Sequence, residues 1–158
     1  RLQSELALIV LDIDEFKRIN DTYGHHVGDQ ALRAVASTLR GALREYDLCV
    51  RFAGDEFIVV ISDSSRDAAE PKRRELQQRV GAIEIEAGPG LRIRLSASAG
   101  AAVFPHDGRS YEALLANADG RMYSDKSARR ARLGASPSLE EGGWSEDVVA
   151  TVAQSVRH

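Results

Sequence analysis

Residues 48–61 of the chain read LCVRFAGDEFIVVI. Two short apolar runs, Leu48 to Phe52 and Phe57 to Ile61, flank the polar segment Ala53-Gly54-Asp55-Glu56. Short apolar runs separated by a turn that contains glycine are typical of a β-hairpin. We therefore predict a hairpin whose tip carries two adjacent carboxylates. Hairpin tips are often acidic for reasons of solubility alone, so a functional role needs a second feature.

That second feature is another acidic pair, which follows the apolar run Leu6 to Leu11. The run predicts a strand buried on both faces, and strand alternation sends Asp12 and Asp14 to the same side. Crowded carboxylates are costly unless a cation or a hydrogen-bond donor lies between them. If the two strands are neighbours, both acidic pairs meet at one edge of the sheet, where they suit Mg²⁺ and nucleotide phosphates. The alternative is a solvated loop whose aspartates cap a helix.

The rest of the chain predicts three helices and one more strand. After a polar segment with turn signals, a helical pattern extends from Val27 to Leu43. A second helix is expected from Asp67 to Ile83, with Pro71 tolerated only in its first turn. Leu91 to Gly100 alternates like a half-exposed strand, and a last helix is capped by Ser110 and reaches about residue 130. This order predicts an α/β or α+β fold, with helices packed on a mostly antiparallel sheet.

Composition limits the class of protein. With 158 residues, 43% apolar and 28% charged, the chain resembles a soluble globular domain, and its net charge of -3 favours neither nucleic acid nor anionic lipid. The only cysteine, Cys49, rules out an internal disulfide and favours a reducing compartment, so we expect a cytoplasmic location. No apolar run approaches the ~20 residues that span a bilayer.

Domain boundaries are expected from changes in composition. We assign residues 1–134 to one domain and residues 135–158, rich in Ser, Pro, Glu and Gly, to a linker or tail that leads towards another domain. A weakly amphipathic helix is expected from Asp147 to Val156. The abrupt opening at Arg1 suggests a fragment of a longer chain.

Three motifs carry a resemblance to a known family. Residues 12–29, DIDEFKRINDTYGHHVGD, are similar to the GGDEF-family signature DxDxFKxxND followed by GHxxGD. Residues 51–57, RFAGDEF, are similar to its R-[YF]-GGDEF hairpin, and residues 118–130 resemble its AD-x-x-[ML]Y-x-x-K-x-x-x-R helix. The resemblance covers about residues 5–132. It implies a fold like the palm of nucleotidyl cyclases and polymerases, with a central, mainly antiparallel sheet flanked by helices.

The resemblance also implies an activity. GGDEF domains are diguanylate cyclases, in which two subunits meet face to face and each binds one GTP. The 3′-hydroxyl of each GTP attacks the α-phosphorus of the other, which yields cyclic di-GMP and two pyrophosphates with Mg²⁺ or Mn²⁺. We expect a homodimer, no nucleic-acid or membrane partner for this segment, and sensor or EAL-type domains elsewhere in the full-length chain. The main rival is a GGDEF domain that only binds GTP or cyclic di-GMP, and a structural dimerisation unit is a third hypothesis.

Site residues follow from matching positions. The metal would be held by carboxylates at the two acidic pairs, and Asp55 is either the catalytic base or a metal ligand. The turn after Asp14 would offer backbone N–H groups to the β- and γ-phosphates. His25 is either a substrate contact or structural. The implied metal ligands are Asp12, Asp55, Glu56 and the Ile13 carbonyl; the catalytic residues are Asp55, Glu56 and Lys17; the substrate-binding residues are Phe16, Asn20, His25, Asp29, Lys126 and Arg130.

Within that set, Asn20 and Asp29 would read guanine, because a carboxylate accepts from its N1–H and N2–H₂ groups and adenine offers no such donors. Arg44 and Asp47 resemble the family's RxxD site, which binds cyclic di-GMP as an inhibitor; a solvated helix end is the alternative.

The chain departs from the family pattern at several points. Ala53 replaces a glycine, which would strain the turn only if its φ is positive. Arg129 also replaces a glycine, and we expect it to alter the end of the last helix. The family's upstream D-x-LTGLxNR segment is absent.

Overall fold

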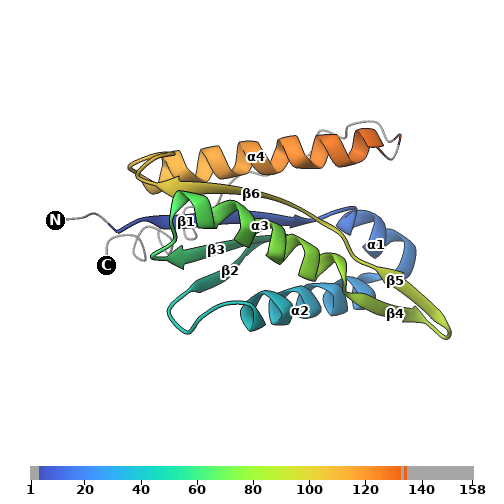
Figure 1. Ribbon diagram of the computed structural model, residues 1–158. Coiled ribbons are helices and arrows are strands. Elements are labelled where there is room, and N and C mark those ends of the chain that lie inside the picture. The colour runs from blue at the N-terminus through green and yellow to red at the C-terminus, as the bar shows by residue number, and fades with distance from the viewer. Residues whose placement is uncertain (1–3, 133, 135–158) are drawn as a thin grey trace.

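The computed structural model describes residues 4–132 and residue 134. A four-stranded sheet in the order β2-β3-β1-β6 is antiparallel at every pairing (Figure 1). A separate two-stranded sheet pairs β4 with β5 and projects from one end of the domain (Figure 1). The strands are β1 (Leu6–Ile13), β2 (Leu48–Ala53), β3 (Glu56–Ser62), β4 (Glu84–Gly88), β5 (Leu91–Arg94) and β6 (Ala97–Phe104).

Helices cover both faces of the larger sheet. Helices α2 and α3 pack on one face, and α4 lies along the other (Figure 1). The short α1 follows the end of β1. The helices are α1 (Phe16–Tyr23), α2 (His25–Gly41), α3 (Arg66–Gly81) and α4 (Tyr111–Arg132). The predicted α+β class, a central antiparallel sheet flanked by helices, is confirmed.

Strand β1 separates the two halves of the hydrophobic core. Its odd-numbered residues, such as Ile9 and Leu11, pack in the cluster that includes α2 and α3, whereas Leu8 and Val10 pack in the cluster that includes α4. An uninterrupted apolar run fits this position because both faces of the strand are buried. The even-numbered face continues to Asp12, which therefore lies on the side of α4.

Close packing of α4 on β6 brings the end of that helix towards Asp12. A Cβ atom on Gly100 would lie 2.1 Å from the Ala118 carbonyl oxygen, so only glycine permits this approach. Ser110 begins the helix as predicted, since its Oγ accepts a hydrogen bond from the Ala113 N–H at 3.2 Å. The helix extends to Arg132, and Arg129 does not shorten it.

Three sequence-based expectations about secondary structure were wrong. The segment Leu91 to Gly100 is not one half-exposed strand: it divides into β5 and β6, and β6 is buried almost throughout because α3 and α4 cover its two faces. Pro71 lies inside α3 rather than in its first turn. Because proline has no backbone N–H, the helix lacks one hydrogen bond at this position. The polar segment after Asp14 contains the helix α1, whose polarity hid it because only Ile19 is buried.

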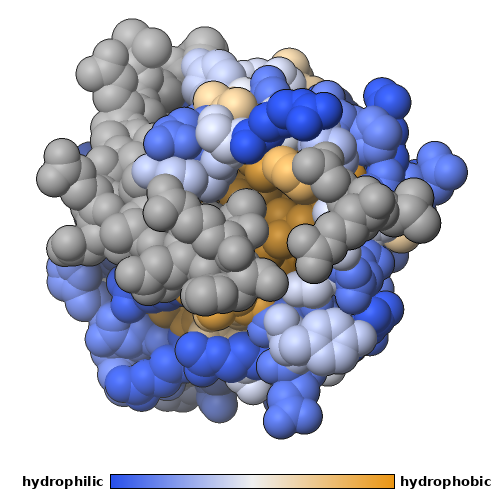
Figure 2. Space-filling view, turned by 90° about the vertical axis from the view of Figure 1, so that its left-hand side faces the viewer, coloured by the Kyte–Doolittle hydropathy of each residue, from blue (hydrophilic) through white to orange (hydrophobic). Residues whose placement is uncertain are grey.

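The end of the domain opposite α1 presents apolar surface among mostly hydrophilic residues (Figure 2). The half-buried residues Leu6, Phe104 and Tyr111 pack against the core in this region. In the part of the chain that the structure describes, no helix is long and apolar enough to cross a membrane. The tail assigned to residues 135–158, including its expected helix, lies outside the described residues.

Candidate active site

The tip of the β2–β3 hairpin lies beside the end of β1. Asp12 pairs with Glu56 across the two strands, and the Ile13 N–H donates to the Asp55 carbonyl oxygen at 3.2 Å. The predicted hairpin is therefore confirmed, and it brings the two acidic pairs to one edge of the sheet.

The hairpin turn accommodates the alanine that replaces glycine. Gly54 has φ 51°, whereas Ala53 is not among the non-glycine residues with positive φ in residues 4–132. Arg51 Nε closes the turn by donating to the Gly54 carbonyl oxygen at 2.9 Å. The substitution at position 53 therefore introduces no left-handed strain.

Asp12 is the buried centre of this acidic region. It is 4% exposed, and its Oδ2 accepts a hydrogen bond and ion pair of 2.9 Å from Lys126 Nζ. Its Oδ1 is buried and has no hydrogen-bond partner when the neighbouring Asp55 is ionised; a hydrogen bond between the Asp55 and Asp12 carboxyl groups contributes to the raised pKa of Asp55. An unsatisfied carboxylate oxygen in a buried position is costly, so this atom is poised to accept a further ligand.

The neighbouring carboxyl groups respond to burial and to Asp12. Burial raises the pKa of Asp55 to about 8, and the adjacent Asp12 carboxyl group adds to the rise. Burial and Asp12 together raise the pKa of Glu56 to about 7. The pKa of Asp119, on α4, is raised by the same two causes. One ammonium group, Lys126, therefore does not offset the negative charge gathered here.

These residues fit a divalent cation by their chemistry. Hard carboxylate oxygens are the preferred ligands of Mg²⁺, and the unsatisfied Asp12 oxygen together with the raised pKa values shows a deficit of positive charge. Within residues 4–132 and 134, however, no three His, Cys, Asp or Glu side chains are already gathered in the geometry of a metal centre. Mg²⁺ needs only one or two carboxylates beside water and phosphate oxygens, so the residues present suffice to hold it.

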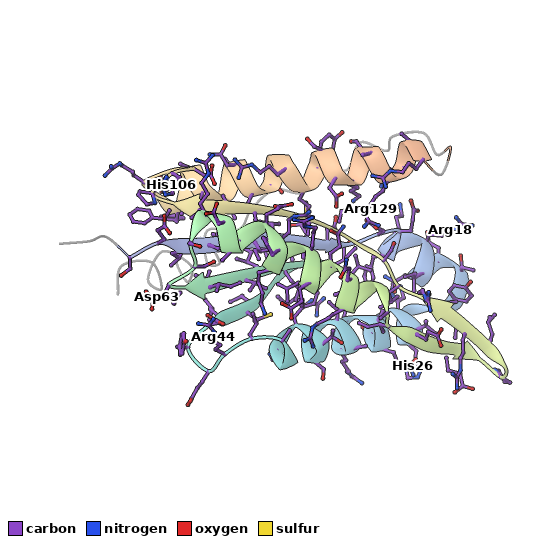
Figure 3. The ribbon with its side chains drawn as sticks, in the orientation of Figure 1. Arg18, His26, Arg44, Asp63, His106 and Arg129 are labelled. Atoms are coloured by element: carbon purple, nitrogen blue, oxygen red, sulfur yellow. The ribbon has the colours of Figure 1, made fainter. Side chains whose placement is uncertain are left out.

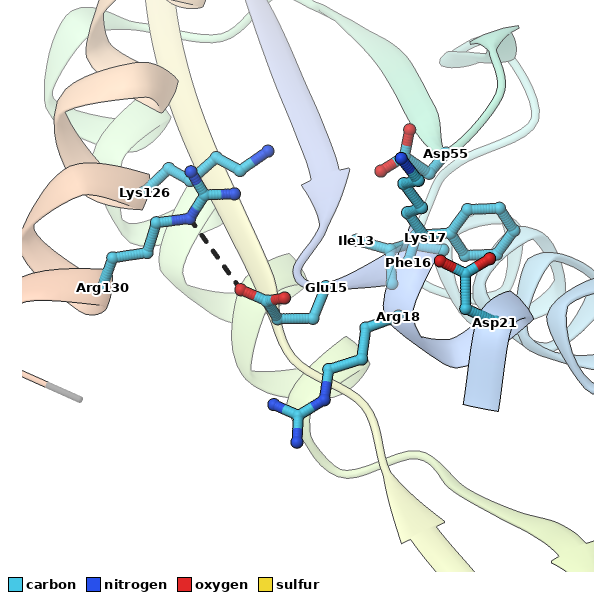
Figure 4. Close-up of a pocket in the computed structure, with 9 residues that line it drawn as sticks. All are labelled: Ile13, Glu15, Phe16, Lys17, Arg18, Asp21, Asp55, Lys126 and Arg130. Atoms are coloured by element: carbon cyan, nitrogen blue, oxygen red, sulfur yellow. Dashed lines mark ion pairs between the residues drawn. The ribbon is translucent and has the colours of Figure 1, made fainter. Parts of the chain in front are cut away.

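A pocket of about 300 Å³ opens beside the carboxylates (Figure 4). Strand β1, helix α1, the hairpin and α4 all contribute to it. Arg130 Nε lies 3.9 Å from Glu15 Oε1 across this opening. Basic side chains alternate with acidic ones around it, which suits a ligand that carries both phosphates and metal. The lining residues are Ile13, Glu15, Phe16, Lys17, Arg18, Asp21, Asp55, Lys126 and Arg130.

The residues expected to read guanine lie next to this pocket in sequence but do not line it. Asn20 is on α1, and His25 and Asp29 are exposed in the first turns of α2. The Asn20 side chain lies against the backbone of Gly28, where an added Cβ would be 1.8 Å from Asn20 Oδ1. The glycine thus allows Asn20 to bridge the two helices.

Arg44 and Asp47 lie at the other end of β2 from the carboxylates, well away from Arg18 (Figure 3). The Asp47 carboxylate accepts hydrogen bonds from the backbone N–H groups of Arg44, at 2.9 Å, and Ser62, at 3.3 Å. Arg44 Nη1 donates to Tyr46 Oη at 2.9 Å, and its guanidinium lies over the Tyr46 ring. Both residues line a small pocket with Lys72. Because the Asp47 carboxylate accepts two backbone hydrogen bonds, it also stabilises the turn, whether or not a ligand binds in this pocket.

Comparison with known proteins identifies the family. The family described as "Diguanylate cyclase, GGDEF domain" matches residues 1–132. The chain belongs to the GGDEF domain family. Diguanylate cyclase DosC of Escherichia coli is 36% identical over 133 residues, which are 84% of this chain and 29% of DosC. Cyclic di-GMP phosphodiesterase NbdA of Pseudomonas aeruginosa is 39% identical over 125 residues, which are 79% of this chain and 16% of NbdA.

Solved structures agree with the fold. The crystal structure of the GGDEF domain of PA1120 (YfiN or TpbB) from Pseudomonas aeruginosa matches with a TM-score of 0.73 and 36% identity, covering 79% of this chain and 78% of that one. The family resemblance seen in the motifs is thus confirmed. This GGDEF domain spans less than a third of DosC, so only the domain is compared.

Several residues at the GGDEF site were missed by sequence reasoning. Arg18 and Asp21 line the pocket because α1 is a helix there, which the sequence pattern did not reveal. Asp119 lies close enough to Asp12 for the Asp12 charge to add to the rise that burial causes in the pKa of Asp119, and its place in the helix motif was the available signal. Ser98 of β6, and Ser96 in the link before it, contact Asp14, and no sequence signal pointed to them.

Proposed function

We propose that the domain is a diguanylate cyclase that condenses two GTP molecules into cyclic di-GMP and two pyrophosphates. The observation that carries this proposal is the buried Asp12 carboxylate, with one unsatisfied oxygen, beside Asp55, Glu56 and a pocket rimmed by Lys17, Lys126 and Arg130. The family supports the same activity. We also propose a cytoplasmic location, because the GTP substrate is available there and the single cysteine, Cys49, fits a reducing compartment.

The proposed chemistry requires two copies of the chain. In each half-reaction the 3′-oxygen of one GTP forms a bond to the α-phosphorus of the other. The bond from that phosphorus to the oxygen that bridges the α- and β-phosphates breaks, and pyrophosphate leaves. Mg²⁺ or Mn²⁺, bound by Asp12, Asp55, Glu56 and the Ile13 carbonyl, would neutralise triphosphate charge and acidify the 3′-hydroxyl. Asp55 is the candidate to hold the departing proton, and Lys17 stabilises charge that develops on the phosphates.

Turnover of GTP tests this function directly. We expect purified protein with GTP and Mg²⁺ to release two pyrophosphates per cyclic di-GMP, measured by chromatography. The rate per subunit should rise with protein concentration, because two subunits must meet. Binding of GTP without product would instead support the receptor, and absence of GTP binding would support a structural unit.

The alternative function, a GGDEF domain that binds GTP or cyclic di-GMP without turnover, has one specific argument in its favour. NbdA, a relative of similar identity, is named for a phosphodiesterase rather than for a cyclase. Against a domain that binds only cyclic di-GMP, the chain keeps the acidic and basic positions that match the family's active pattern, and product binding has no need of a metal-binding carboxylate cluster. A domain that binds GTP without turnover is distinguished by the product assay above.

Feedback by product is part of the proposal. Arg44 is exposed at the rim of a pocket that also contains Asp47 and Lys72, so it is available to contact guanine edges and phosphate. We expect Arg44→Ala to raise the concentration of cyclic di-GMP needed for half-inhibition about tenfold, the size of one lost bidentate contact. The initial rate without added product should not fall.

The measurement is initial velocity against added cyclic di-GMP for the unaltered chain, Arg44→Ala and the neighbouring exposed variant Glu45→Ala as a control. Inhibition should be non-competitive with GTP, because β2 separates this pocket from the carboxylates. Coincident curves for the first two proteins would reduce Arg44 to a solvated residue of the turn.

A further inference from the structure

Asp14 lies beside the carboxylate site, but its partners differ from those of Asp12. Its Oδ1 accepts a hydrogen bond of 2.6 Å from Ser98 Oγ, and its Oδ2 accepts one of 2.8 Å from Ser96 Oγ. Its backbone N–H donates to the Ser96 carbonyl oxygen at 2.9 Å. Arg129 Nη1 lies 3.9 Å from Oδ2. Protein donors therefore occupy both oxygens of Asp14, whereas Asp12 keeps one oxygen without a donor.

The backbone that follows Asp14 needs such support. Glu15 has φ 56° and ψ 33°, the left-handed conformation, which is unfavourable for a residue with a Cβ atom. No side chain caps the N-terminus of α1, and the helix holds this turn through the Ile19 N–H, which donates to the Glu15 carbonyl oxygen at 3.0 Å. Strained residues persist where the surrounding structure fixes them, and here further contacts to the preceding residue, Asp14, come from Ser96 and from Ser98 of β6.

The two serines reach Asp14 from different places, one inside β6 and one just before it. Ser98 is opposite Asp12 in the β1–β6 register and is completely buried, so its hydroxyl group faces the same side of the sheet as Asp12 and Asp14. Ser96 lies in the link between β5 and β6, where the strand pairing is interrupted. The turn that Asp14 holds is continuous with Glu15, Phe16 and Lys17, which line the pocket.

We propose that Asp14, Ser96 and Ser98 form a latch that fixes the turn before α1 and so orients Phe16 and Lys17 towards the phosphate groups of the ligand. Asp14 is then a positioning residue and not a metal ligand, and Ser96 and Ser98 act through it. The inference deepens the proposed function, since it takes the ligand at this pocket to be a nucleotide triphosphate or its pyrophosphate group.

The test is calorimetric titration of the chain with inorganic pyrophosphate and Mg²⁺, which needs no turnover. We expect Ser96→Ala/Ser98→Ala and Asp14→Asn to bind pyrophosphate at least about tenfold more weakly, because hydrogen bonds to a charged group are lost. Ser96→Thr keeps the hydroxyl group and should bind pyrophosphate about as tightly as the unaltered chain. Ser124→Ala removes an exposed hydroxyl that bonds only to its own helix, at Gly120, and is the matched control.

Kinetics separate positioning from general damage. The latch variants should raise KM for GTP about tenfold and also lower kcat, because the latch orients Lys17, which acts on charge that develops in the transition state. Ser96→Thr, which keeps the hydroxyl group, should leave both constants close to those of the unaltered chain. If the double variant fails to fold, Ser96→Ala compared with Ser96→Thr decides the same question. Equal pyrophosphate affinity in all variants, or none in the unaltered chain, overturns the latch. Weakened binding in the latch variants of a chain that forms no cyclic di-GMP would keep the latch and reject the cyclase.

Discussion

Asp55→Asn is expected to lower the rate of cyclic di-GMP formation at least about 10³-fold. The substitution removes one negative charge from the proposed metal site, where a metal would contribute several kcal/mol of transition-state stabilisation, and ~4 kcal/mol corresponds to about 10³-fold in rate. It also removes the candidate proton acceptor. Initial rates with GTP and Mg²⁺ measure the effect, and Asp12→Asn should behave in the same way.

A matched variant shows whether the position or the charge matters. Asp67 is an exposed aspartate in the first turn of α3, which follows the end of β3 opposite to Glu56. Asp67→Asn should keep full activity. Unaltered turnover in both Asp55→Asn and Asp12→Asn would refute the assignment of the metal site.

The same Asp55 variant should be more stable than the unaltered chain when no metal is present. The pKa of Asp55 is raised to about 8 in the folded protein against 3.8 as the ordinary value, so the folded state holds its proton more tightly than the unfolded state. Stability is therefore lost as pH rises from about 4 towards 8, and the neutral asparagine avoids this loss. Thermal unfolding in a chelator should show a higher midpoint for Asp55→Asn at pH 8, and the difference should shrink towards pH 4.

The second large effect concerns the base. We expect the unaltered chain to prefer GTP over ATP by at least about 10³-fold in kcat/KM, because a site that hydrogen-bonds a substrate rejects an analogue without those donors. Asp29 is exposed at the start of α2, and Asn20 is fixed near it against Gly28. Asp29→Ala should lose most of this preference, chiefly through a lower kcat/KM for GTP.

The measurement compares kcat/KM for GTP and ATP in the unaltered chain, Asp29→Ala and Gln30→Ala, the last altering the adjacent helical residue. Gln30→Ala should retain the preference for GTP. Comparable rates with both nucleotides in the unaltered chain would contradict the assignment of Asp29, and an unchanged ratio in Asp29→Ala would assign base recognition to other residues.

Local patterns predicted much of the fold. The continuous apolar run of β1, the hairpin with its acidic tip and the amphipathic α2 each have a periodicity that neighbouring elements reinforce, so these elements were predicted from sequence. The failures share one cause. The helix α1 is mostly solvated, and the division of residues 91–104 into β5 and β6 depends on α3 and α4 covering β6, which no local pattern records.

By itself, the sequence determined the family, and the order and residue types of its motifs selected the positions that we propose for metal, phosphate and base. Tertiary structure alone decided how two aspartates of one motif differ. Asp12 lies under α4 with an oxygen left unsatisfied, while Asp14 is held by two serines that are more than eighty residues away in sequence. Strand alternation sends both side chains to the same face, so only the donors that β6 and α4 bring to that face distinguish them.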